Sequence, residues 1–78
     1  MATVRLFAHA REAAGIARDQ VPGATVEQVL AEAVKRYGAE FKEQLQICQV
    51  WLNGEPVLGC EPVGDGDEVA VLPPVSGG

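Results

Sequence analysis

Thr25-Val26-Glu27-Gln28-Val29-Leu30-Ala31-Glu32-Ala33-Val34-Lys35-Arg36-Tyr37-Gly38 is the one stretch of this sequence that predicts a complete helix. Thr25 and Gln28 have the spacing of a capping box, and Gly38 provides the stop. Glu27 lies at the positive end of the helix dipole. A helix with a single apolar stripe needs a sheet to lie across, so the flanking segments should supply strands. The stripe consists of Val26, Val29, Leu30, Ala33, Val34 and Tyr37.

Two segments before this helix are predicted to be strands. Residues 3–9 alternate between the two faces of a half-buried strand. Residues 10–15 form a connection, and residues 17–21 return as a second strand before the Pro22-Gly23 turn. The two strands should pair as a hairpin. In the first strand Val4, Leu6 and Ala8 share one face, and Arg5, Phe7 and His9 share the other.

Three further strands are predicted after the helix, beyond a looser stretch that contains Phe41 and Leu45. Residues 48–52 form the first, and Asn53-Gly54 is the favoured pair for a type I′ hairpin, so residues 55–58 should return antiparallel. The glycine-bearing turn at residues 64–67 leads into a last strand at 68–72. Parity points Val50, Leu52, Val69 and Val71 toward the core, and Trp51, Ala70 and Leu72 outward.

This order of elements predicts an α+β domain with the β-grasp arrangement: a mixed sheet with one main amphipathic helix on one face. The other sheet face is left to solvent. Phe7 and Leu72, together with Trp51 and Pro56, form an apolar area on that face. Single apolar residues are common on any surface, but a contiguous patch beside an extended tail favours a docking surface.

Size and charge exclude several classes of protein. The chain has 78 residues and a net charge of −5, which fits one acidic domain of residues 1–72 plus a short tail. Lys and Arg are scattered, which argues against nucleic acid and anionic membrane as partners and favours a basic protein partner. No apolar stretch approaches the ~20 residues that span a bilayer. The first residues lack a secretory signal, so we expect a cytoplasmic protein.

Few side chains suggest chemistry of their own. Cys48 and Cys60 are too far apart for a Cys-x-x-Cys pair, and His9 is the only histidine, so we expect no metal site and interpret both thiols as buried small hydrophobes. A Cys–His nucleophile would lack a third, orienting partner. Asp65-Gly66-Asp67-Glu68 is interpreted as a turn and not as a calcium loop. No glycine precedes Lys-Ser or Lys-Thr, so the chain itself should not bind ATP.

The last six residues, Pro73-Pro74-Val75-Ser76-Gly77-Gly78, are predicted to leave the domain as an extended tail. The two prolines cannot donate to a sheet ladder and favour extended backbone. At ~3.3 Å per residue the tail reaches about 20 Å. A partner can close tightly around Gly77 and Gly78 because they lack a Cβ. The tail therefore suits threading into another protein's active site; an ordinary frayed end is the alternative.

The sequence resembles the ubiquitin-like sulfur carriers, and most closely the small subunits of molybdopterin synthase. The likeness covers the whole chain, and its most specific part is the acidic turn, strand, Pro-Pro-Val and Gly-Gly in register at the C-terminus. One departure is Val71-Leu72, where bulky aromatic residues are common in the family. The matching motifs are Val4-Arg5-Leu6-Phe7-Ala8, Arg11-Glu12, Gly15, Thr25-Val26-Glu27, Asn53-Gly54, Asp65-Gly66-Asp67-Glu68-Val69-Ala70 and residues 73–78.

The resemblance implies that the reacting group is the Gly78 carboxylate and that the chain binds no cofactor. A ubiquitin-activator-like adenylyltransferase would adenylate it with ATP-Mg, because an acyl-adenylate carries a good leaving group and a carboxylate does not. A sulfur donor protein would supply the sulfur of the thiocarboxylate. The charged carrier would then dock on the large subunit of molybdopterin synthase and donate sulfur to cyclic pyranopterin monophosphate.

The resemblance also assigns roles to the remaining site residues. Phe7, Leu72, Trp51 and Pro56 would form the partner-binding face, and Pro73, Pro74, Val75, Ser76 and Gly77 would thread into the partner. Alternatives stay open: a carrier for thiamine or cysteine synthesis, a modifier that forms isopeptide bonds to lysines, or a plain interaction module. The oligomeric state of the complex and the choice of molybdenum or tungsten also stay open.

Overall fold

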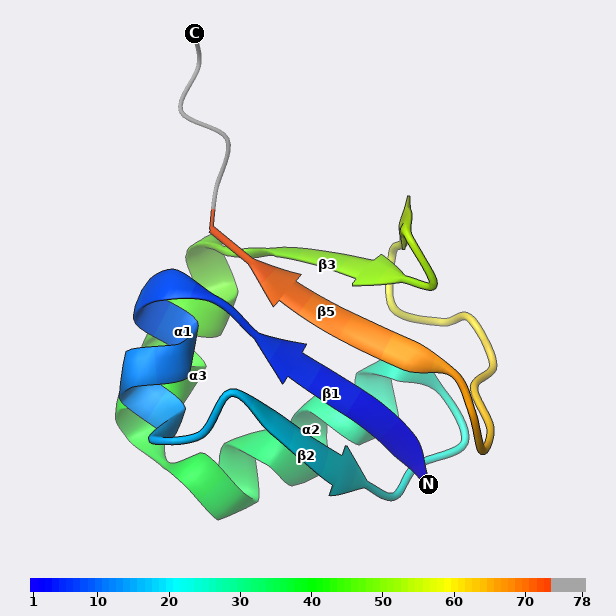
Figure 1. Cartoon of the computed structure of the whole chain (residues 1–78), viewed down its shortest axis with the longest axis horizontal. Coiled ribbons are helices and arrows are strands. Elements are labelled where there is room, and N and C mark those ends of the chain that lie inside the picture. Colours follow the sequence, from blue (N-terminus) through cyan, green and yellow to red (C-terminus); the bar gives the residue numbers. More distant parts are fainter. Residues whose placement is uncertain (74–78) are drawn as a thin grey trace, which may run out of the picture.

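The structure is a computed structural model that describes residues 1–73. All three helices of this part of the chain lie in its first two thirds, and its last three elements are strands (Figure 1). The elements are β1 (Ala2–Leu6), α1 (Ala8–Ala14), β2 (Arg18–Val21), α2 (Val26–Tyr37), α3 (Ala39–Ile47), β3 (Gln49–Leu52), β4 (Glu55–Pro56) and β5 (Glu68–Leu72).

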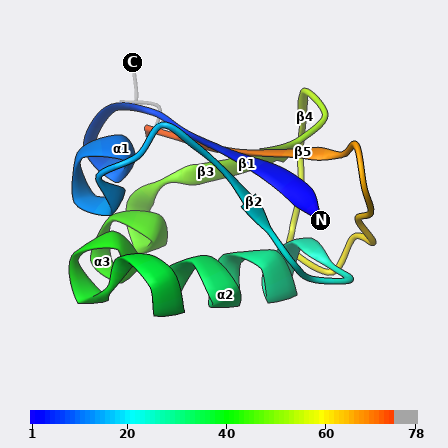
Figure 2. The ribbon, with the colours of Figure 1, turned by 60° about the horizontal axis from the view of Figure 1, so that its bottom comes forward.

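The strands form one mixed sheet in the order β2-β1-β5-β3-β4. β1 and β5 pair in parallel at its centre, and the other neighbours are antiparallel. Figure 2 shows α1, α2 and α3 together on one face of the sheet, while the opposite face has no covering element among residues 1–73. The predicted two-layer β-grasp arrangement is confirmed. No helix in the described part of the chain is long and apolar enough to span a membrane.

The core lies between this sheet and α2, as the apolar stripe predicted. Val26, Val29 and Ala33 are fully buried, while Leu30, Val34 and Tyr37 are partly buried against the same cluster. Every second residue of the two central strands points into the core, since side chains alternate across a strand. These inward residues, all nearly inaccessible, are Ala2, Val4, Leu6, Val69 and Val71.

The start of α2 is capped by its own side chains and by a distant loop. Thr25 Oγ1 accepts from the Gln28 N–H at 3.2 Å, as the capping box predicted, but Gln28 Oε1 accepts from Ala24 one residue earlier than the motif implies. The N–H groups of Val26 and Glu27 donate to carbonyl oxygens at residues 61 and 59. Two of the four unpaired N–H groups of the helix are thereby satisfied, and the loop after β4 is fixed to α2.

The prediction for residues 3–15 is wrong in one respect: β1 ends at Leu6 and α1 occupies most of the expected connection. Ala8 starts α1 with φ +52°, which breaks the alternation that seemed to continue through His9. The helix spans only seven residues and fully buries Ala10 alone, so it leaves little periodic signal. His9 lies on the α1 surface, where Nδ1 is 3.4 Å from a Glu12 carboxylate oxygen.

The looser stretch predicted after Gly38 is also wrong, because it forms α3. Gly38 ends α2 and begins α3, and its φ of +99° suits a residue without a Cβ. Phe41 is the single fully buried residue of α3, and its ring meets the Tyr37 ring edge-on at 5.1 Å. A nine-residue helix with one buried side chain gives a weaker stripe than α2, which is why it escapes a reading by periodicity.

The hairpin after β3 is confirmed, but its return strand is shorter than predicted. Asn53 and Gly54 have φ values of +51° and +86°, as a type I′ turn requires. β4 is limited to Glu55–Pro56, although the Val57 N–H beyond it still donates to the Val50 carbonyl of β3 at 3.2 Å. The predicted strand end at Leu58 is instead a loop position with 96% of the side chain exposed.

The free edge of the sheet at β2 is tied to α2 by a polar network. The Tyr37 hydroxyl donates to Asp19 Oδ2 at 2.6 Å, and Arg36 Nη1 donates to the same oxygen at 3.1 Å and to the Gln20 carbonyl at 2.8 Å. The Gln20 N–H donates to Asp19 Oδ1 at 2.9 Å. The N–H and the carbonyl of Gln20, which face away from β1, are therefore both hydrogen-bonded to side chains and not to another strand. The Tyr37 hydrogen bond above all, with Arg36 and the Gln20 N–H, lowers the pKa of Asp19 below its ordinary value of 3.8, although desolvation opposes the shift.

Gly23→Ala should destabilise the domain by about 2 kcal/mol or more. Gly23 has φ +156°, and a Cβ there would lie 2.7 Å from both the backbone nitrogen and Cγ2 of Val29. Gly64→Ala is the matched control, because a Cβ at Gly64 meets nothing within 4 Å, and it should change stability by less than about 0.5 kcal/mol. Urea unfolding at pH 7 measures both, and equal stability of the two variants would contradict this account.

Tyr37→Phe should lower the free energy of unfolding by about 1 to 2 kcal/mol at pH 7, because it removes a hydrogen bond to a charged acceptor and keeps the ring against Phe41. Since the folded-state pKa of Asp19 is lowered, the stability that this carboxylate contributes is complete well above the ordinary value of 3.8 and is lost progressively as pH falls from that value through the lowered folded-state pKa. The gap between wild type and variant should shrink from pH 7 to pH 3 in denaturant titrations. A gap that widens at low pH would contradict the assignment.

Candidate functional site

The uncovered sheet face carries one straight cross-strand row to which every strand contributes a residue. The pairing register places Arg5 opposite Arg18 on one side and opposite Ala70 on the other. Trp51 lies opposite Ala70, and Pro56 lies opposite Trp51. The row is therefore basic on β2 and β1 and apolar from β5 to β4.

Phe7 and Leu72 lie beside this row, toward the end of β5. The Phe7 N–H donates to the Val71 carbonyl at 3.2 Å, and continuing the β1–β5 register by one residue places Phe7 next to Leu72. Phe7, Leu72 and Trp51 are half-buried, and Pro56 is exposed. The structure thus brings the four residues predicted for a docking surface onto one face. Their role in binding a partner stays a prediction.

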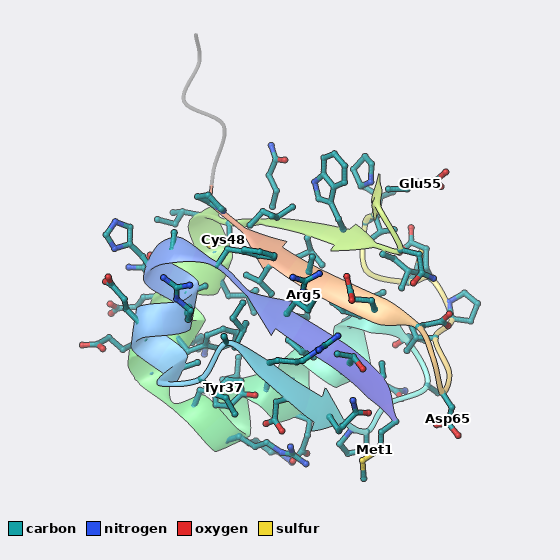
Figure 3. All side chains as sticks on the ribbon, viewed as in Figure 1. Met1, Arg5, Tyr37, Cys48, Glu55 and Asp65 are labelled. Atoms are coloured by element: carbon teal, nitrogen blue, oxygen red, sulfur yellow. The ribbon has the colours of Figure 1, made fainter. Side chains whose placement is uncertain are left out.

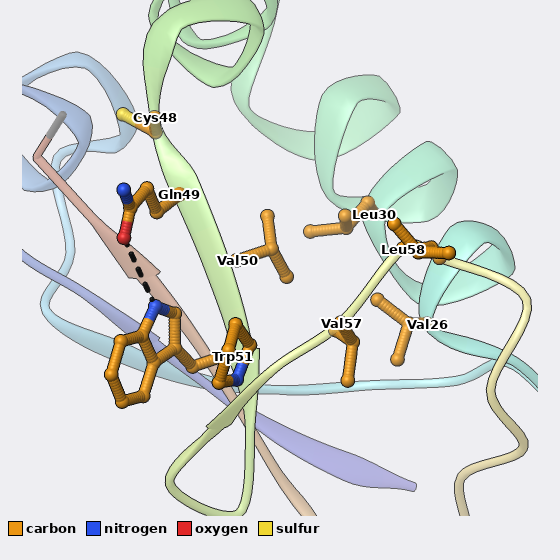
Figure 4. A pocket seen from close by; sticks show the side chains of 10 residues that line it. Val26, Leu30, Cys48, Gln49, Val50, Trp51, Val57 and Leu58 are labelled. Atoms are coloured by element: carbon orange, nitrogen blue, oxygen red, sulfur yellow. Dashed lines mark hydrogen bonds between the residues drawn. The ribbon is translucent and has the colours of Figure 1, made fainter.

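The indole of Trp51 is oriented by a neighbour on the same strand. Its Nε1–H donates to Gln49 Oε1 at 3.2 Å (Figure 4). Figure 4 also shows that the indole lies on the opposite side of β3 from Val50, which points with Leu30 into a hollow of about 500 Å³ between β3 and α2. Trp51 therefore presents a fixed aromatic surface to the uncovered face.

Arg5 is a residue of this face that the sequence analysis did not single out as part of the site. Its guanidinium carbon lies 5.4 Å from the centroid of the Phe7 ring, and Nη1 lies 3.4 Å from Glu68 Oε1 (Figure 3). A cation over an aromatic face is attracted by the ring quadrupole. The contact keeps the arginine stem and the Phe7 ring together on the uncovered side. Its outward position in the β1 alternation was the available signal.

The two thiols differ more than predicted. Cys48 is half-buried at the end of α3, and burial raises its pKa, which keeps it in the poorly nucleophilic thiol form. Cys60 is exposed, so its prediction as a buried residue is wrong. Within residues 1–73, no group of three His, Cys, Asp or Glu side chains is placed to hold a metal ion.

The start of the tail is placed by the middle strand of the sheet. Leu72 ends β5, where it pairs with Gln49, and Pro73 follows as an exposed residue. β5 lies between β1 and β3, so Pro73 follows the central strand of the sheet (Figure 1). The rest of the predicted tail, Pro74, Val75, Ser76, Gly77 and Gly78, lies outside the described residues.

Residues 4–78 match a family model described as the ThiS family. The chain belongs to the ThiS family. It is also 38% identical over 80 residues to the molybdopterin synthase sulfur carrier subunit of Chlamydomonas reinhardtii, which covers 96% of this chain and 95% of that protein. The chain is accordingly a sulfur carrier, as the resemblance of its motifs implied.

Solved structures of similar proteins have the same fold over nearly the whole length. SAMP1 of Haloferax volcanii, a small archaeal modifier protein, matches with a TM-score of 0.79 and 33% identity, covering 97% of each chain. A complex of subunits 1 and 2 of the molybdopterin-converting factor from Helicobacter pylori contains a chain that matches with a TM-score of 0.71 and 26% identity. That match covers 99% of this ThiS-family chain and 97% of the other. The ubiquitin-like β-grasp fold is thereby confirmed.

The reactivity of the two thiols tests the burial of Cys48, which lines the hollow between β3 and α2. Iodoacetamide should alkylate Cys60 at least about tenfold faster than Cys48 in the native ThiS-family domain, because only the thiolate reacts and burial disfavours it at Cys48. Peptide mass spectrometry after timed quenching measures the two rates. The difference should disappear in denaturant, and equal rates in the native protein would contradict the burial of Cys48.

Proposed function

We propose that this sulfur carrier is the small subunit of molybdopterin synthase. The observation that carries the proposal is the 38% identity, over nearly the full length of both chains, to a protein named as that subunit. The complex of subunits 1 and 2 of the related molybdopterin-converting factor supports the large subunit as a partner. The sulfur-transfer role rests on the Gly-Gly end of the sequence.

The chemistry belongs to Gly78 and to enzymes that act on it. In an activating enzyme related to the ubiquitin activators, a Gly78 carboxylate oxygen attacks the α-phosphorus of ATP-Mg, and pyrophosphate leaves. The terminal sulfur of a persulfide on a sulfur donor protein then attacks the acyl carbon, and AMP leaves as the carbon–sulfur bond forms. A thiol then breaks the sulfur–sulfur bond of this acyl disulfide, which leaves the thiocarboxylate on Gly78 and a disulfide on the donor side. The thiocarboxylate finally transfers its sulfur to cyclic pyranopterin monophosphate on the large subunit, and water restores the carboxylate. The domain contributes binding and positioning.

The geometry of the described residues supports this division of labour. Burial raises the pKa of the half-buried thiol Cys48, which makes it a poor nucleophile. Phe7, Leu72, Trp51 and Pro56 share the face beside Pro73. A partner that covers this face would lie directly beside the root of the tail. Residues 73–77 would then lead Gly78 into the partner's active site.

A protein modifier is a second candidate, favoured by the similarity to the small archaeal modifier protein of H. volcanii. The same acyl-adenylate, or a thioester made from it, can be attacked by a lysine amine to form an isopeptide bond. Carriers for thiamine or cysteine synthesis would share the thiocarboxylate and differ in the acceptor. The acceptor therefore distinguishes these functions, whereas the activation step does not.

Incubation with the cognate activating enzyme, ATP-Mg and a sulfur donor should add the mass difference between sulfur and oxygen to the intact chain. Fragmentation should place that change at Gly78. A chain extended by one alanine after Gly78 is the matched control and should gain nothing, because its carboxylate is displaced by one residue and shielded by a Cβ. Loading of both chains, or of neither with any cognate activator, would contradict the carrier mechanism.

The loaded chain, mixed with the large subunit and cyclic pyranopterin monophosphate, should then yield molybdopterin, detected after oxidation by fluorescence. Loading without molybdopterin formation would reject the pathway and retain the carrier. Lysine-linked conjugates of the chain in a cell lysate, in place of molybdopterin formation, would establish the modifier.

A further inference from the structure

The uncovered face has an uneven distribution of charge along the row Arg18–Arg5–Ala70–Trp51–Pro56. Among the strand residues that the register assigns to this face, the charged ones are Arg5, Arg18 and Glu68. The face therefore carries two positive charges and one negative charge, in a chain whose net charge is −5. The positive charges lie on β1 and β2, at one end of the sheet, and the apolar residues lie over β5, β3 and β4.

The two arginines are only partly neutralised within the domain. Arg5 lies 3.4 Å from a Glu68 carboxylate oxygen, with both side chains more than a third exposed. Arg18 is exposed, and no ion pair within residues 1–73 includes it. The neighbouring carboxylate on β2, Asp19, is bound to Arg36 and Tyr37 on the other side of the strand. One carboxylate thus faces two guanidinium groups.

The pairing of Arg5 with Arg18 is by itself unfavourable for the fold. Arg5 and Arg18 are direct cross-strand neighbours, and like charges in that position repel. Contact of Arg5 with the Phe7 ring and with Glu68 offsets part of that cost for one of the two. A carboxylate on a molecule that covers the face would remove the rest. An Arg guanidinium also presents a planar fork of donors that fits a carboxylate at two points.

We propose that Arg5 and Arg18 bind carboxylates of the protein that covers the uncovered face, and that this contact sets the orientation in which that protein docks. The inference rests on the proposed function, because it takes the docking partner to be the large synthase subunit. The partner surface is specified by its chemistry: acidic side chains opposite β1 and β2, and apolar side chains opposite Trp51 and Pro56.

The asymmetry of the row allows one in-plane orientation and penalises the reverse. A partner turned by half a turn would bring its carboxylates over Trp51 and Pro56, where they lose water without gaining a cation. Its apolar residues would cover Arg5 and Arg18. Orientation matters here because Pro73 leaves from the central strand, so the docking angle sets where the tail enters the partner. The correct orientation is thus selected in two ways: its own contacts are favourable, and the contacts of the reversed orientation are unfavourable.

Binding of the Arg5→Gln/Arg18→Gln double variant to the large subunit tests the proposal. The matched control is Lys35→Gln/Lys42→Gln, which changes the net charge equally but alters two exposed residues on α2 and α3, on the covered side of the sheet. The Arg variant should bind about tenfold more weakly, since two rim charge pairs are lost, and the control should stay within about twofold. The dependence of the association rate on salt should flatten in the Arg variant alone.

A fluorine label at Trp51 tests whether the partner docks on the uncovered face. Trp51 is the only tryptophan, so the chain labelled with 5-fluorotryptophan gives one ¹⁹F resonance, which should shift on binding in wild type and control. Equal binding by the Arg variant and wild type, or equal weakening by the Arg variant and the control, would overturn the orientation proposal and leave the proposed function intact. If wild type itself does not bind the large subunit, the proposed function fails and the inference falls with it. Circular dichroism melts confirm that each variant is folded.

Discussion

The parallel pairing of β1 with β5 is the contact on which the rest of the molecule depends. It joins the first and last strands, so every other element must lie in the connection between them. It also brings Val4 and Leu6 beside Val69 and Val71, which together form the surface that α2 covers. Because residues far apart in sequence must meet before this core exists, its formation closes a long loop, which tends to slow folding. Pro73 directly follows β5, so the chain leaves the domain from one of the two strands that form this core.

The division between a covered and an uncovered sheet face explains how so small a chain can both fold and bind. One face supplies the core and the other is free for a partner, because strand side chains alternate. Fixing Trp51 through Gln49, and Phe7 through the Arg5 guanidinium, orders part of the uncovered face before any partner arrives. A pre-ordered surface loses less conformational entropy on association than a mobile one.

Sequence patterns predicted the parts of this fold that have strong periodicity or a special turn. The α2 stripe, the Asn53-Gly54 turn and the alternation of β5 each have a local cause, and the structure confirms them. α1 and α3 were missed because each fully buries only one side chain, which leaves nothing for a periodic pattern to detect. Phe7, Leu72, Trp51 and Pro56 could be grouped by parity alone. The basic end of the row could not, because the meeting of Arg5 with Arg18 depends on the β1–β2 register across a helix-containing connection.

The bonds around Gln20 affect how the molecule behaves in a crowded solution. A strand at the border of a sheet exposes donors and acceptors that another chain can use as a template for strand addition, the first step toward fibrils. At β2 this template is interrupted, since the Asp19 carboxylate occupies the Gln20 N–H and the Arg36 guanidinium occupies its carbonyl. The Asp19 and Arg36 side chains, which join α2 to β2, therefore also disfavour strand pairing between two copies of the protein. Strand addition at β2 would first have to break these two hydrogen bonds.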